Sequence, residues 1–168
     1  AANTAYMVSN GNATVYPAAH YCNDLVINGY SDWYLPARDE LEIAYRNFKP
    51  TTEANTSSSS KLTSTYVYTD IDDGGSSAPG VNNHSIPVGT AYTRSAATNP
   101  AQTTLAPFKQ GGAETFYMDT NSYYHTSTEF SATEDYIQGF SGVHSGLQNK
   151  SGMTNTMHVR AFRAVKIS

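Results

Sequence analysis

The side chains able to perform acid–base, nucleophilic or metal chemistry are few in this chain and lie far apart. A glycoside hydrolase would need two carboxylates about 5 to 10 Å apart in a cleft, and the sequence offers no obvious pair. No phosphate-binding glycine loop, His-Glu-x-x-His motif or paired-cysteine motif is present. The histidines lack the spacing of zinc ligands; they are His20, His84, His125, His144 and His158. We therefore predict a protein that is not an enzyme and needs neither metal nor cofactor.

Several acidic groups and one thiol have a chemical interpretation, but a structural one explains each of them better. The run Asp70–Asp73 precedes two glycines as in part of a calcium loop, yet the Glu that closes such a loop is missing, so we favour a plain turn. Asp39, Glu40 and Glu42 lie near the start of a predicted helix, where the helix dipole and solvent account for acids. Cys22 is expected to be a small core residue.

Two arginines near the C-terminal end leave two interpretations open. Arg160 and Arg163 could bind a sulfated or carboxylated ligand, since guanidinium groups form paired hydrogen bonds with such anions. Alternatively they form buried pairs, with Glu129 or Asp32 as partners. We favour the buried pairs.

The composition favours binding through uncharged groups. Only 14% of the 168 residues are charged, against about 25% in a typical soluble domain. Polarity comes instead from Ser, Thr, Asn, Gln and Gly together with 13 Tyr, as in antibody binding loops. An extracellular β-rich domain without a special ligand is the alternative.

Charge and hydropathy also exclude classes of partner. The net charge is −4 and no basic run exists, so we expect no nucleic-acid partner. No apolar run approaches the ~20 residues that span a bilayer, so we expect no membrane insertion.

The run Gly29–Leu41, which holds the single Trp of the chain, organises the first part of the sequence. Residues 1–16 contain Asn10-Gly11 between apolar stretches, which predicts a hairpin of two short strands. Pro17 then starts a predicted helix, with an apolar face at Ala18, Cys22, Leu25 and Val26, that ends at Asn28-Gly29. A second helix is predicted to begin after Pro36 and to stop at Lys49-Pro50.

The second half predicts a sheet. We interpret residues 51–122 as a long loop insertion with short strands near 65–69, 91–93 and 115–118. Strands follow at 123–129 and 135–141, and a polar loop, 142–154, leads to a final strand at 157–167. The expected fold class is α+β, an antiparallel sheet with two helices beside it. It forms a single domain over 1–168, with its core at about 1–49 and 123–168.

Two sets of residues follow from this layout. Candidate ligand-binding residues are the aromatic and amide side chains that we expect on loops or on an exposed strand face: Tyr66, Tyr68, Asn82, Asn83, Tyr92, Tyr123, Tyr124 and His125. Expected structural core residues are Trp33, Leu41, Tyr45, Phe48, Glu129, Arg160 and Arg163.

Three motifs in sequence order resemble a known family. They are Gly29-Tyr30-Ser31-Asp32-Trp33 with Leu35-Pro36 and Asp39-Glu40-Leu41, then Ser127–Thr133, then Val159–Val165. Together they resemble the C-terminal domain family of bacterial collagen-like adhesins and phage tail fibres. The chain departs from that family at Ala37, where a Ser or Thr usually caps the helix, and within 51–122.

The resemblance implies a C-type lectin-like fold and a receptor-binding, adhesive function. We expect the tip domain of a trimeric phage tail fibre, outside the cell on the virion, that recognises a host cell-surface glycan or protein without calcium. One alternative is a bacterial surface adhesin that binds sulfated polysaccharide. Another is a virion structural or decoration domain that contacts neighbouring proteins.

Overall fold

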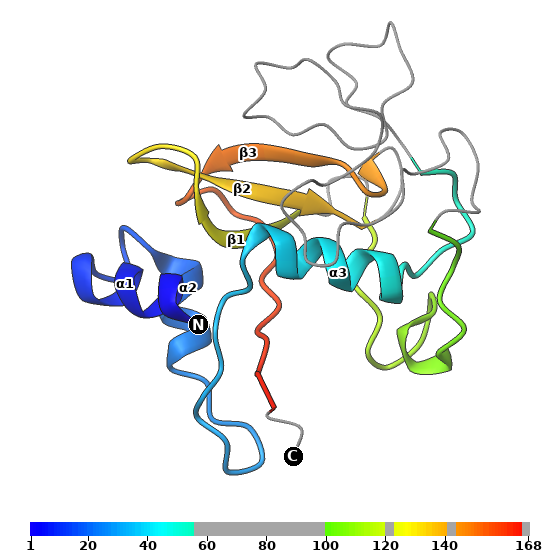
Figure 1. The fold of residues 1–168 in the computed structure, drawn as a ribbon, viewed down its shortest axis with the longest axis horizontal. Helices are drawn as coiled ribbons and strands as arrows, with labels where there is room; N and C mark the ends of the chain where they lie inside the picture. Colours follow the sequence, from blue (N-terminus) through cyan, green and yellow to red (C-terminus); the bar gives the residue numbers. More distant parts are fainter. Residues whose placement is uncertain (56–99, 120–122, 141–143, 166–168) are drawn as a thin grey trace, which may run out of the picture. The chain divides into compact units, whose positions relative to one another are not determined.

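The computed structural model describes residues 1–55, 100–119, 123–140 and 144–165. Their helices are α1 (Ala2–Asn10), α2 (Pro17–Asn23), α3 (Arg38–Phe48) and the 3-10 helix η3 (Ala106–Phe108) (Figure 1). Strands β1 (Tyr123–Glu129), β2 (Glu134–Gly139) and β3 (Gln148–Gly152) form an antiparallel sheet in the order β1-β2-β3. The predicted α+β class is therefore confirmed. The strands expected at 65–69 and 91–93 lie outside the described residues.

Contacts along the chain define two compact units. Unit 1 consists of Ala1–Arg38, Tyr124–Ile137 and Lys150–Ser168. Unit 2 consists of Asp39–Tyr123 and Gln138–Asn149.

In unit 1 the N-terminal residues form helix α1, so the predicted hairpin over 1–16 is wrong. The helix buries Thr4 and Met7, which are three residues apart on one face. The Thr4 hydroxyl donates to the Leu35 carbonyl and accepts from the Leu35 N–H, each at 3.1 Å. Gly11 ends the helix, and its N–H donates to the Met7 carbonyl. Asn10-Gly11 is thus a helix stop, because packing against residue 35 stabilises a helix that is too short to form alone.

Helix α2 begins at Pro17 as predicted but ends earlier, at Asn23. Asn28 and Gly29 have φ values of 54° and 80°, and Ile27 and Tyr30 pair across them. Positive φ at both central residues is what a tight hairpin turn requires. Val26, expected on the apolar helix face, lies between the end of α2 and this turn and is 69% exposed.

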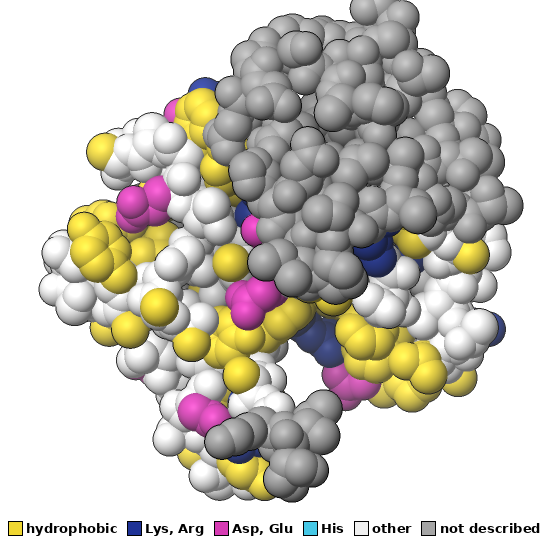
Figure 2. All heavy atoms as spheres, viewed as in Figure 1, with side chains coloured by type: hydrophobic (Ala, Val, Ile, Leu, Met, Phe, Trp, Pro, Cys, Tyr) yellow, Lys and Arg dark blue, Asp and Glu magenta, His cyan; other side chains and the backbone are white. Residues whose placement is uncertain are grey.

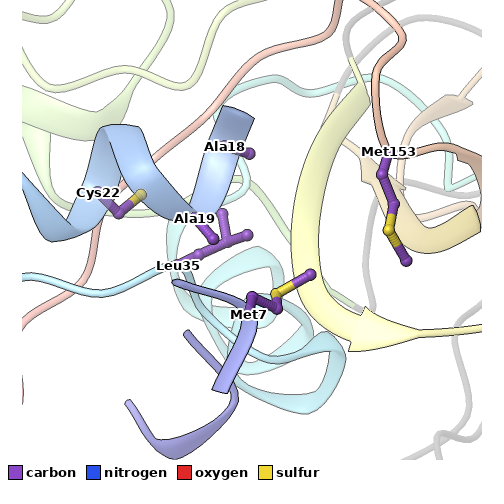
Figure 3. Close-up of a cluster of buried hydrophobic side chains, with 6 residues drawn as sticks. All are labelled: Met7, Ala18, Ala19, Cys22, Leu35 and Met153. Atoms are coloured by element: carbon purple, nitrogen blue, oxygen red, sulfur yellow. The ribbon is translucent and has the colours of Figure 1, made fainter. Parts of the chain in front are cut away.

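The core of unit 1 joins α1 and α2 to the segment after this turn. Figure 3 shows Leu35 beside Ala19 of α2, with Met7 of α1 nearby. Cys22 is fully buried in the same cluster, which raises the pKa of its thiol to about 12. Cys22 is thus a packed core side chain.

Trp33 does not fill this core. It is only half-buried, and its indole Nε1–H donates to the Tyr30 carbonyl at 3.0 Å. The neighbouring Tyr34 and Leu35 take the core positions, at 8% and 1% exposed. The indole therefore stabilises the turn before it.

Residues of all three motifs meet inside unit 1, although Asp39-Glu40-Leu41 of the first motif belongs to unit 2. The Ser127 N–H donates to the Pro36 carbonyl at 2.8 Å, and Tyr34 and Phe162 exchange two backbone hydrogen bonds. The Thr128 hydroxyl accepts from the Arg38 N–H at 3.0 Å. Thr128 thus supplies from β1 the N-terminal cap that Ala37 cannot supply itself.

In unit 2, helix α3 buries Leu41 and Tyr45, which were expected in the core, together with Ala44. Phe48, also expected in the core, is half-buried and stacks on Phe108 with ring centroids 4.3 Å apart. Glu42, expected in solvent, is fully buried. It lies 2.6 Å from Arg46 Nε and accepts from Gln138 Nε2 at 2.8 Å.

Aromatic side chains fill the remaining core of unit 2. Phe140 stacks on Phe116 with ring centroids 3.9 Å apart and meets Tyr45 edge-on at 5.4 Å. Residues 115–118 form no strand, contrary to prediction. Phe116 reaches the core from an irregular segment of backbone, because stacking on Phe140 requires its side chain and not a strand.

The last two elements also differ from prediction. Strand β3 lies inside the predicted polar loop 142–154, where its exposed residues give no alternating pattern. The predicted final strand is extended chain in its described part, 157–165, with isolated bridges at His158 and Phe162. Those bridges go to different partners, Tyr124 and Tyr34, so no continuous ladder forms.

Candidate functional site

Unit 1 contains a hollow of about 390 Å³ beside helix α2, which we call the His125 pocket. Pockets for small ligands usually measure about 300–1,000 Å³ and combine apolar walls with a few fixed polar groups. Tyr21 of α2, 57% exposed, offers an accessible aromatic ring. The lining consists of Pro17, Ala18, Tyr21, His125, Thr154, Asn155, Thr156, Met157 and Val159.

His125 is held from both ring nitrogens. Nδ1 lies 2.7 Å from Asp135 Oδ2, and Nε2 lies 2.9 Å from the Asn155 carbonyl oxygen. Both side chains of the His125–Asp135 pair are 3% exposed. The pocket therefore has a rigid imidazole in its wall, because two hydrogen bonds fix the ring plane.

The two acceptors determine how His125 titrates. Burial alone would lower the pKa of His125, but the hydrogen bond to Asp135 and its negative charge outweigh burial and raise that pKa. As an imidazolium, the ring donates to both oxygens. The carboxylate and the backbone carbonyl hold both nitrogens, so His125 is a positioned donor rather than a free base.

For Tyr123, Tyr124 and His125 the sequence allows an exposed stacking face or side chains that alternate across the sheet, and the burial of all three contradicts the exposed face. They are 9%, 4% and 3% exposed. The Tyr123 hydroxyl lies 2.8 Å from His144 Nδ1, and burial lowers the pKa of His144. Packing covers both faces of β1, which the alternation of the sequence could not reveal. Of the three, His125 lines the pocket beside α2.

The charged residues expected in the core lie nearer the surface. Glu129 is exposed, and burial together with the Glu129 carboxylate raises the pKa of the Tyr16 hydroxyl. Arg160 is half-buried. Arg163 Nε lies 2.5 Å from Asp32 Oδ1, with side chains 25% and 56% exposed. The predicted pairing of Arg163 with Asp32 is therefore present, although the pair is not buried.

The other candidate ligand-binding residues, Tyr66, Tyr68, Asn82, Asn83 and Tyr92, lie outside the described residues, as does the run Asp70–Asp73. The described part of the insertion contributes to a separate hollow of about 610 Å³ in unit 2. Residues 100–105 line it together with Arg46, Asn47 and Phe48.

Sequence reasoning missed most of the His125 pocket. Tyr21 falls within the predicted helix that begins at Pro17, and Asp135 is the first residue of a predicted strand, but neither was expected at a binding site. Thr154 is the last residue of the predicted polar loop 142–154, and no element was predicted for Asn155 and Thr156. A usable signal existed in this polar triplet followed by Met157, since loops that bind ligands combine such groups.

The surface agrees with the low charge of the sequence. Figure 2 shows, on the described part of one face, charged side chains of both signs scattered among hydrophobic and uncharged ones. Among the described residues, no group of three or more His, Cys, Asp or Glu side chains could hold a metal ion. No helix in the described ranges has the length and apolar character needed to cross a membrane.

Comparison of the sequence with known protein families, with curated proteins and with solved structures found no match.

Proposed function

We propose that this chain is a non-enzymatic receptor-binding module with a C-type lectin-like fold, located at the tip of a phage tail fibre. In this proposal it attaches to a host cell by recognising a surface glycan or protein. The observation that carries the proposal is the His125 pocket, where an exposed tyrosine and a fixed imidazole line the same hollow. Tyrosine provides contact area at a small cost in conformational entropy.

The arrangement of the three motifs supports the same function. In unit 1 they form one connected frame through the pairs Ser127–Pro36, Tyr34–Phe162 and Arg163–Asp32. Such a frame leaves neighbouring loops available for recognition. Trimerisation on a fibre would strengthen weak single sites about 10²- to 10⁴-fold when the geometry allows simultaneous contact.

The test compares two tyrosines of similar exposure. Tyr21 lines the pocket and is 57% exposed, while Tyr117 lies outside it in unit 2 and is 55% exposed. Labelled protein is titrated onto a panel of bacterial cells and onto a glycan array. We expect Tyr21→Ala to weaken binding at least about tenfold, and Tyr117→Ala to change it less than about twofold. Unchanged binding by Tyr21→Ala would contradict the role of this pocket, and an absence of any binding partner would contradict the function.

The loop insertion needs its own variant. Replacing residues 56–99 with a short Gly/Ser linker tests the sequence-based prediction that the insertion carries the recognition surface. We expect weaker binding from a variant that still folds. Unchanged binding would restrict recognition to the other residues.

The alternative functions are distinguished by salt and by assembly. A sulfated polysaccharide ligand predicts binding that fades as salt rises. We place it second because Arg163 and Lys150 have acidic neighbours, Asp32 and Glu134. A virion decoration domain predicts binding to purified virion proteins and none to cells.

A further inference from the structure

A second, smaller hollow lies in unit 1 between helix α1 and the end of strand β1. Its volume is about 180 Å³, and Asn3, Tyr6, Ser127, Thr128 and Glu129 line it. This volume is below the ~300–1,000 Å³ of pockets for drug-sized ligands. It suits one ring of a larger molecule.

Ser127 gives the first indication that this hollow takes a polar ligand. The residue is 2% exposed, and its Oγ is buried without a hydrogen-bond partner among the described residues. Buried hydroxyls in native proteins nearly always have a partner. Ser127 lines the hollow, so a ligand hydroxyl that reached this oxygen would provide one.

The other polar groups of the hollow are already oriented. Asn3 Nδ2 donates to the Ser127 carbonyl at 3.0 Å, which fixes the amide and leaves its oxygen as an acceptor. Burial and the nearby Glu129 carboxylate raise the pKa of the Tyr16 hydroxyl, which places that hydroxyl close to the carboxylate of the hollow. Preorganised groups lose little entropy when a ligand binds.

The aromatic ring and the charge define the class of ligand. Tyr6 is 61% exposed, so its ring is accessible for stacking. The lining contains one carboxylate, Glu129, and no Lys or Arg. A carboxylate accepts hydrogen bonds from hydroxyl groups but repels an anion. The combination fits a neutral sugar ring and disfavours a sialylated or sulfated one.

We propose that this hollow is a subsite for one neutral hexose of a glycan, with Tyr6 under the ring and Ser127 and Glu129 bonded to its hydroxyl groups. The inference rests on the proposed function only in taking a glycan as the ligand. It adds the kind of sugar and assigns a role to residues outside the His125 pocket.

The test uses the full chain and free sugars. Glucose, galactose, mannose and sialic acid are titrated into ¹⁵N-labelled protein while the amide signals of Asn3, Tyr6 and residues 127–129 are followed. We expect at least one neutral hexose to shift these signals with millimolar affinity. We expect sialic acid to bind at least about tenfold more weakly.

Three variants give the residue-level result. Tyr6→Ala and Ser127→Ala should each weaken hexose binding about tenfold, whereas Glu129→Gln should reduce the discrimination against sialic acid. Tyr21→Ala, in the neighbouring pocket, should leave these shifts unchanged. Thermal melting identifies any variant that fails to fold, and Ser127→Ala removes a single oxygen, so it keeps the test decisive.

The outcomes separate this inference from the proposed function. Failure of every neutral hexose to shift these signals, or equal binding by Ser127→Ala, overturns the subsite even if the protein still binds cells through Tyr21. If neutral hexoses shift the amide signals of a protein that binds no cell and no array glycan, the result would support the subsite and contradict the receptor-binding function.

Discussion

The substitution Asp135→Asn tests whether His125 is held as a paired cation. Both side chains of the pair are 3% exposed. An amide in place of this carboxylate would leave either a buried imidazolium without a counter-charge or a neutral ring, whose Nδ1 accepts from the amide NH2 and whose Nε2–H donates to the Asn155 carbonyl. Breaking a buried ion pair by removing one partner costs about 3–5 kcal/mol. Because the amide keeps an oxygen in place for Nδ1, we expect a loss at the lower end, about 3 kcal/mol, near pH 5.5.

The effect should depend on pH in a defined direction. The folded pKa of His125 is raised, so the stabilisation by the pair is fully present below the ordinary histidine pKa of about 6.5. It is lost as pH rises through the raised folded pKa. The difference between wild type and Asp135→Asn should therefore shrink between about pH 5.5 and pH 9. Urea unfolding followed by circular dichroism measures it.

A neighbouring acid provides the control. Glu134 pairs with Lys150 at 3.3 Å, but these side chains are 34% and 38% exposed. Exposed ion pairs contribute about 0–1 kcal/mol, so Glu134→Gln should lower the free energy of unfolding by less than about 1 kcal/mol. The reasoning is refuted if Asp135→Asn costs as little as this control, or if its cost is equal at both pH values.

Two further substitutions test packing and capping. A Cβ on Gly139 would lie 2.1 Å from the His144 carbonyl oxygen, whereas at Gly152 the nearest atom is 3.4 Å away. Overpacking typically costs about 1–3 kcal/mol. Chemical unfolding should therefore show that Gly139→Ala lowers the free energy of unfolding by about 3 kcal/mol and Gly152→Ala by less than about 1 kcal/mol. Similar losses for the two variants would contradict the steric argument. Thr128→Val removes the oxygen that accepts from the Arg38 N–H, and it should cost about 1 kcal/mol by thermal or urea unfolding, as loss of a helix cap does. A neutral result there would mean that Thr128 does not cap α3.

The sequence by itself determined the elements whose signals are local. Pro36 and the acids Asp39 and Glu40 mark the start of α3, and the apolar spacing through Tyr45 marks its buried face. Pro17 marks the start of α2, and the β-forming run 123–129 marks β1. These signals act within a few residues through steric limits, the helix dipole and side-chain periodicity. Because these signals are local, the sequence predicts the corresponding elements without knowledge of the fold.

Two Asn-Gly pairs show that a local sequence signal does not always determine the local structure. We expected a hairpin at Asn10-Gly11 and a helix end at Asn28-Gly29, and the structure has the two the other way round. The dipeptide permits both outcomes, because Asn and Gly suit turns as well as helix ends. Contact of Thr4 with Leu35, far along the chain, decides for the helix at the first pair.

The candidate site was decided almost entirely by tertiary structure. The sequence made His125 a candidate ligand-binding residue because an exposed side chain was expected. In the structure it is buried and hydrogen-bonded to Asp135 and to the backbone at Asn155. Tyr21 and Tyr6 line hollows with residues of β1, and the roles proposed for them rest on those positions. Burial and hydrogen-bond partners depend on which distant segments pack together, and no spacing within one segment encodes that.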